Sequence, residues 1–225
     1  MVVVIQARDE GPGTQSGGQP NGGSPIPTVD PIPALPAGSV DPGRYVLSSS
    51  DPALDASHRI TIDVVDGYES FEGVAVDKAV ETGGGHVITL AVSDVWADAC
   101  QWKGSLLDRS AVASTDAVVA ALASQEGLRV STPTAVTVDG FDGTYMERRV
   151  PAQIDIESTC DGGSVSLYQA PEFHRTLHGE LQLLWIVDVD GAPLVIDVQL
   201  DEGASAQVRA ELEQMVESIQ IEPVN

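Results

Sequence analysis

The order of apolar and polar positions predicts strands early in the folded part of the chain. In residues 59–65, the apolar Ile60, Ile62 and Val64 alternate with the polar Thr61 and Asp63, which is typical of a half-buried strand. A turn at Asp66-Gly67 ends this strand. Residues 73–78 and 86–92 are two further strand candidates, and the glycines at 83–85 predict a turn between them.

Two segments have helical spacing instead. The first is capped by Ser114 or Thr115, runs to about Gln125 and has Gly127 beyond its end. Its apolar stripe consists of Val118, Val119, Ala121 and Leu122. The second covers residues 205–218. The side chains expected to face inward are those of Val208, Leu212, Met215 and Val216. Both helices are amphipathic, so each is expected to pack one face against a sheet.

Two hairpins are centred on Asp-Gly dipeptides, which favour tight two-residue turns. Residues 129–138 and 143–150 flank the first dipeptide, at 139–140, and Pro133 breaks the leading strand or confines it to an edge. Residues 181–189 and 194–200 flank the second, at 190–191. The very apolar run 183–187 predicts a central strand. Ile219 and Ile221 predict a short last strand.

This order of elements predicts an α+β fold in which two helices pack on a largely antiparallel sheet. We assign residues 43–223 to one globular domain. Residues 7–42 are rich in glycine and proline, cannot bury a core, and are predicted to form a disordered linker.

Residues 1–6 carry an apolar run too short to cross a membrane. Because this run leads directly into the linker, we interpret it as the end of a transmembrane segment. The hypothesis is that the chain continues a longer protein, anchored by a single membrane span upstream of residue 1.

The charge of the chain limits the classes of partner that it can bind. It holds 34 acidic and 11 basic residues, a formal net charge of -23. Phosphate backbones and anionic membrane surfaces would be repelled, so we expect no nucleic-acid partner. In most proteins, an excess of acidic residues like this one forms solvated surface. We expect a monomeric domain with an unknown protein or small-molecule partner in the cell envelope.

Two cysteines, Cys100 and Cys160, lie 60 positions apart in polar surroundings. Structural thiols are more often found among apolar residues, so this setting favours a disulfide. The alternative is two unpaired thiols. No nearby Cys or His completes a zinc site with either one. A disulfide would place the domain outside the cytoplasm. Trp96 and Trp102 flank the first cysteine and are expected to cover the bridge and the sheet edge.

The sequence carries no recognised catalytic signature. It lacks the G-x-S-x-G elbow of hydrolases and both common phosphate-binding glycine motifs. The serine after two glycines at 162–163 is not a nucleophile motif. We therefore predict no enzyme, no catalytic residue and no cofactor.

Several segments carry residue types that bind metals, and none is assigned as a metal site. His174 and His178, with Glu180 nearby, would share a helical face, but the segment is too short for a stable helix and is interpreted as a surface loop. His58 and His86 are interpreted as strand residues. A weak cation site could be formed by Asp155, Glu157 and Asp161. Residues 188–191 start like a calcium loop but fit a hairpin turn better.

Two sets of residues resemble known exported domains. The turn Val65-Asp66-Gly67-Tyr68 and the closing segment 218–221 are similar to those of PsbP-like domains and of mycobacterial LpqN-type lipoproteins. Segments 97–102, 160–163 and 184–191 resemble uncharacterised membrane-tethered domains of actinobacteria. The resemblance implies a PsbP-like α/β sandwich and carries over no catalytic residue.

Three functions follow as expectations. The first is a non-catalytic extracytoplasmic sensor, adaptor or binding domain tethered to the cell envelope, with ligand-binding residues unknown. The second is a carrier of a small apolar or lipid-like ligand, which an apolar cavity against the sheet would favour. The third is a hydrolase with unrecognised residues.

Overall fold

The computed structural model describes residues 31–49, 51–78, 83–170, 174–177 and 181–224. The segment Ile32–Asn225 forms one compact unit. The strands and helices within it confirm the predicted α+β class, with antiparallel pairing between all the named strands. The predictions for residues 1–6 and 7–30 lie outside the described residues.

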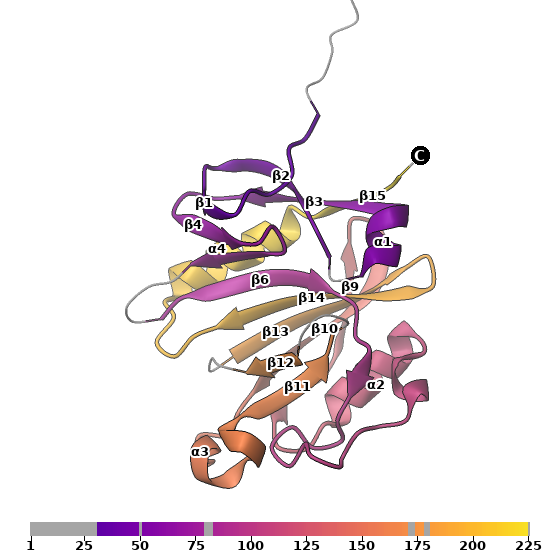
Figure 1. Cartoon of the computed structure of the whole chain (residues 1–225), viewed down its shortest axis with the longest axis vertical. Coiled ribbons are helices and arrows are strands. Elements are labelled where there is room, and N and C mark those ends of the chain that lie inside the picture. Colours follow the sequence, from indigo (N-terminus) through magenta and orange to yellow (C-terminus); the bar gives the residue numbers. More distant parts are fainter. Residues whose placement is uncertain (1–30, 50, 79–82, 171–173, 178–180, 225) are drawn as a thin grey trace, which may run out of the picture. The chain divides into compact units, whose positions relative to one another are not determined.

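A nine-stranded sheet forms the middle of the fold (Figure 1). Its strands lie in the order β1 (Gly38–Val40), β4 (Tyr68–Phe71), β5 (Ala75–Lys78), β6 (Gly85–Leu90), β14 (Ala192–Leu200), β13 (Leu181–Val189), β10 (Phe141–Arg149) and β8 (Arg129–Val130). Strand β9 (Thr134–Val138) also pairs with β10. The very apolar strand β13 lies in the interior of the sheet, as predicted.

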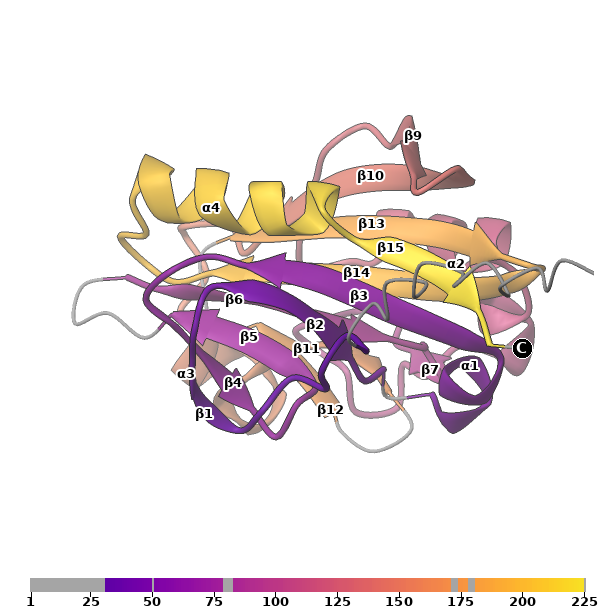
Figure 2. The ribbon, with the colours of Figure 1, turned by 90° about the horizontal axis from the view of Figure 1, so that it is seen from above.

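Separate layers cover the two faces of this sheet (Figures 1 and 2). One layer holds helix α4 (Ala206–Glu217) and the three-stranded sheet β15 (Gln220–Pro223), β3 (His58–Val64) and β2 (Gly43–Leu47). The other holds helix α2 (Thr115–Ser124) and the sheet β12 (His174–Leu177), β11 (Val165–Gln169) and β7 (Asp94–Val95). Short elements complete them: α1 (Pro52–Ser57), α3 (Ile156–Thr159), η1 (Arg109–Val112) and η2 (Asp161–Gly163).

The alternation of side chains along β13 produces two hydrophobic cores. Leu183 and Val187 pack into the core beneath α4, and Leu184 and Ile186 pack into the core beneath α2. Because successive strand residues point to opposite faces, a strand buried on both faces is apolar throughout.

The predictions of two Asp-Gly hairpin turns and of the Ser114 cap are confirmed. The turn predicted at residues 83–85 is not, because Gly85 begins β6 and residues 79–82 lie outside the described residues. Asp139-Gly140 and Asp190-Gly191 join their strands with positive φ at both turn residues, 47° and 86° in the first and 52° and 88° in the second. This is the backbone of a type I′ turn, in which glycine is favoured at the second position. Ser114 caps α2 by accepting a hydrogen bond from the Ala117 amide.

Three features of the fold differ from the sequence predictions. The linker boundary at residue 42 is wrong, because β1 pairs with β4 and Leu35 is buried. The strands β4, β7, β11 and β12 are not predicted by the sequence pattern, since they are short or lack clear alternation. Four α-helices are present among the described residues rather than two, the added pair having six and four residues.

Strands β10 and β13 pack closely at Gly143. A Cβ atom at this position would lie 2.7 Å from the Ile186 carbonyl oxygen and 3.1 Å from the Val187 Cα. Both neighbours are backbone atoms of the central strand and cannot move aside. Gly143→Ala is expected to lower the free energy of unfolding by about 1–3 kcal/mol in chemical denaturation. The control is Thr137→Ala, at an exposed position of β9. Gly140→Ala would not serve as a control, because the φ of Gly140 is positive and alanine would be strained there.

Candidate functional site

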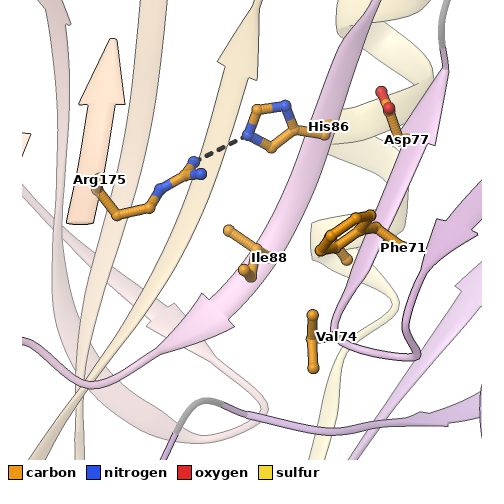
Figure 3. Close-up of a pocket in the computed structure, with 7 residues that line it drawn as sticks. Phe71, Val74, Asp77, His86, Ile88 and Arg175 are labelled. Carbon is orange, nitrogen blue, oxygen red and sulfur yellow. Dashed lines mark hydrogen bonds between the residues drawn. The ribbon is translucent and has the colours of Figure 1, made fainter. Parts of the chain in front are cut away.

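A pocket of about 280 Å³ lies over strands β4, β5 and β6, on the face of the sheet that carries the α2 core. Its apolar lining is Phe71, Val74, Ala75 and Ile88, and its polar lining is Asp77, His86 and Arg175. Figure 3 shows Arg175 reaching from β12 toward His86, with Phe71 and Ile88 between β12 and the β4–β5 turn. Ligand sites commonly combine such an apolar lining with a few converging polar groups.

The tight turn between β4 and β5 positions the apolar rim. Glu72 and Gly73 have φ of 51° and 77°, and the Val74 amide donates to the Phe71 carbonyl across the turn at 3.0 Å. Phe71 and Val74 are therefore held at the two ends of this turn. The Phe71 side chain is 64% exposed, an unusual position for a large apolar residue.

The polar side of the pocket belongs to a row of polar residues that crosses six strands. Antiparallel register places them as successive neighbours on one face of the sheet: Glu69, Asp77, His86, Gln199, Gln182 and Arg148. Exposure falls along this polar row, from exposed Glu69 to fully buried Gln182 and Arg148. The pocket thus opens where the polar row leaves the core.

An ion pair anchors Arg175 at the inner end of the pocket. Its Nε and Nη2 atoms each donate to Asp197 Oδ2 at 3.1 Å, and the Tyr168 hydroxyl donates to the same oxygen at 2.5 Å. Asp197 is fully buried, and the Arg175 side chain is 14% exposed. Burial raises the pKa of Asp197, but Arg175 and Tyr168 outweigh it and lower that pKa below its usual value.

His86 contacts Arg175 in the pocket wall. Its Nε2 atom lies 2.8 Å from Arg175 Nη2. His86 is a strand residue, as predicted, and it also lines the pocket, which was not predicted.

Arg148 closes the buried end of the polar row. Its guanidinium donates to Gln182 Oε1 at 2.9 and 2.6 Å and to Gln125 Oε1 at 2.7 Å. Burial lowers its pKa to about 10, although the charge of Asp197 acts in the opposite direction. Arg148 therefore remains protonated at neutral pH, held by amide oxygens rather than by a direct carboxylate contact.

The predicted disulfide between Cys100 and Cys160 is confirmed, and both residues are 6% exposed. Trp102 covers the nearby chain by donating from Nε1 to the Asp161 carbonyl at 2.8 Å, and it packs edge-on against Trp96. The bridge lies in the α2 core, apart from the residues that line the pocket.

The described residues do not bring the candidate ligands Asp155, Glu157 and Asp161 together as a metal site. His174 starts strand β12, so the loop interpretation is wrong and the helical spacing does not apply; His178 and Glu180 lie outside the described residues. Asp155 caps α3, and Asp161 accepts the Lys103 amide. Among the described residues, no group of three or more His, Cys, Asp or Glu side chains could hold a metal ion.

One arrangement has the residue types of a hydrolase triad. Ser57 Oγ lies 3.0 Å from His58 Nδ1, and His58 Nε2 lies 3.1 Å from Asp190 Oδ2. Ser57 Oγ is also 3.0 Å from the Ala53 carbonyl oxygen and 3.1 Å from that of Leu54. These helix carbonyls hold the hydroxyl proton and would repel an oxyanion, so this geometry gives little support to nucleophilic catalysis.

Comparisons with known proteins leave the family open. No protein-family model matches the chain, and no curated protein matches it in sequence. A crystal structure from Bacteroides thetaiotaomicron VPI-5482 is similar over 80% of this chain, with 10% sequence identity and a TM-score of 0.36. The match spans 48% of that protein's chain. A similarity at this level carries no argument about function.

Proposed function

We propose that the domain is a non-catalytic extracytoplasmic binding module, tethered to the cell envelope, whose ligand occupies the pocket beside Arg175. The pocket carries the proposal, because an open apolar surface ends at polar groups that are already held in place. Arg175 is fixed by Asp197 and Tyr168 before any ligand arrives, so its position adds no ordering cost to binding.

The pocket volume favours a small ligand. At about 280 Å³ it lies just below the usual range of pockets for drug-sized molecules. Among the described residues, buried apolar side chains make up both cores beside it. A small-ligand binding module is therefore favoured over a lipid carrier.

The disulfide supports an extracytoplasmic location, because such bonds persist mainly in oxidising compartments. No helix among the described residues is long and apolar enough to span a membrane.

A pocket-filling variant tests the binding site. Val74→Trp adds bulk at the half-exposed rim, and Leu106→Trp is a matched control on a 57% exposed side chain away from the pocket lining. In a fragment screen by ligand-observed NMR, we expect ligands whose affinity Val74→Trp lowers about tenfold or more, with the control unchanged. Fragments that bind both variants alike would contradict the pocket assignment.

The non-catalytic part of the proposal has its own test. Wild type and Ser57→Ala are compared on ester, phosphate and glycoside substrates. We expect no turnover by either protein. Turnover by wild type that Ser57→Ala abolishes would instead establish the Ser57–His58–Asp190 arrangement as a hydrolytic site.

A further inference from the structure

The pocket contains a carboxylate without a counter-charge. Asp77 is half-buried in the pocket wall and forms no ion pair within the part of the chain that the structure describes. Burial raises its pKa above the usual value, and the negative charges of Asp201 and Glu69 raise it further. Folding therefore brings this carboxylate into surroundings that disfavour its charge.

Two partly buried carboxylates of the fold, Glu211 and Glu147, have cations beside them. Lys78 Nζ lies 2.7 Å from Glu211, and Arg209 Nη2 lies 2.8 Å from Glu147. Lys78 follows Asp77 directly, but its ammonium binds on the α4 side of the sheet. Asp77 is thus a carboxylate in a cavity whose neighbouring lysine is engaged elsewhere.

Arg175 does not turn the pocket into an anion site. Its charge is matched by Asp197, and its Nε and Nη2 atoms already donate to that carboxylate and to His86. With Asp77, Glu69 and Asp201 nearby, the open side of the pocket is net negative. This charge favours a cation.

The remaining walls favour an apolar body on that cation. Phe71, Ala75 and Ile88 form the neighbouring row on the same face, since Phe71 pairs with Ala75 and Ala75 with Ile88. Figure 3 shows Asp77 and Phe71 on the side of the pocket away from Arg175, on the paired strands β5 and β4. The exposed ring of Phe71 also offers a π face to a cation.

We infer that the pocket binds a small organic ammonium ion, with its charged group at Asp77 and its apolar body over Phe71, Ala75 and Ile88. This inference rests on the proposed binding function and specifies the ligand class. The same charge could come from a lysine side chain of a partner protein. We assign the free amine, because the pocket volume of about 280 Å³ matches a small body.

Binding of matched probes to the full chain tests the inference. n-Hexylammonium, hexan-1-ol and hexanoate share a chain length and differ in charge. By isothermal titration calorimetry, n-hexylammonium is expected to bind wild type at least about fivefold more tightly than hexan-1-ol, with hexanoate weakest. Asp77→Asn should lower the affinity for n-hexylammonium about fivefold and leave that for hexan-1-ol unchanged.

Glu217→Gln is the matched control, since it removes the same charge from an exposed position on α4, across the sheet from the pocket. It should leave all three affinities unchanged. Asp77→Asn should also raise Tm by about 1–2 °C at pH 7 and by nothing at pH 3, because it removes a charge that folding disfavours. This stability measurement shows that a loss of binding is not a loss of folding.

Specific outcomes overturn the inference. Equal affinities for n-hexylammonium and hexan-1-ol, both lost in Val74→Trp, would refute the cation while the proposed binding pocket stands. Equal loss of n-hexylammonium binding in Asp77→Asn and Glu217→Gln would mean nonspecific attraction to an acidic protein. Tighter binding of Nα-acetyl-lysine methylamide than of n-hexylammonium would reassign the site to a lysine side chain and overturn the free-amine assignment.

Discussion

Asp197→Ala is expected to lower the free energy of unfolding by about 3–5 kcal/mol, a large fraction of the total stability of a typical domain. The substitution removes the acceptor of both Arg175 donors and of the Tyr168 hydroxyl. It leaves a guanidinium and a phenol in a nearly closed site, where water replaces the lost contacts poorly.

Urea unfolding of three proteins measures this effect: wild type, Asp197→Ala and a control, Asp63→Ala. Asp63 also pairs with an arginine, Arg44, at 2.6 Å, but the Asp63 side chain is 48% exposed. The control should therefore lose about 1 kcal/mol or less. Similar losses of unfolding free energy in Asp197→Ala and Asp63→Ala would show that burial does not increase the contribution of Asp197 to stability.

The same carboxylate makes stability depend on pH in a defined direction. The pKa of Asp197 is lowered by folding, so its contribution is complete above the unfolded pKa of about 3.9 and is lost as pH falls through the folded pKa. The difference in unfolding free energy between wild type and Asp197→Asn should be constant from about pH 5 to 8 and shrink below about pH 4. A difference that grows on acidification would contradict the lowered pKa.

Replacing both cysteines with serine is expected to lower the free energy of unfolding by about 4 kcal/mol, because the bridge closes a loop of 60 residues in the unfolded chain. The segments around residues 100 and 160 should still pack together in the folded double-serine variant. The Asp161 amide donates to the Cys100 carbonyl at 2.8 Å, and the Ser166 amide donates to that of Ala99 at 2.8 Å.

Chemical unfolding with and without reductant measures this second effect. Reduced wild type should match the double serine variant, and oxidised wild type should exceed both. A double variant as stable as the oxidised protein would show that the bridge does not restrict the unfolded chain. Thiol titration of protein from its native compartment tests the location: two free thiols before reduction would contradict an extracytoplasmic domain.

The sequence pattern does not predict the candidate site, although one signal is present in it. Asp197 and Gln199 interrupt a strand that is otherwise apolar, and all seven residues from Leu194 to Leu200 are buried. A carboxylate in such a strand requires a buried partner. Arg175 supplies it from β12, for which the pattern favours a loop because the segment is short and follows Pro171 closely.

The sequence by itself determined the local structure of this protein. Asp-Gly pairs set two hairpin turns, Ser114 and Ser205 set two helix starts, and the pattern of α4 set its buried side. Each signal is local, because turn dihedrals, caps and helical spacing depend on a few neighbouring residues. The polar setting of the two cysteines was also enough to predict their bridge, which the structure confirms.

Only the tertiary structure decided that Glu69, Asp77, His86, Gln199, Gln182 and Arg148 form one row, and that Arg175 closes the pocket at their side. These residues come from distant parts of the chain, and their alignment depends on strand order and register. A shift of one residue in any strand would send its polar side chain to the opposite face. The Asp190-Gly191 turn sets the pairing of Gln182 with Gln199 locally, but no local pattern encodes the register of β6 on β14 or of β10 on β13. Those two pairings depend on how the two cores pack on the sheet.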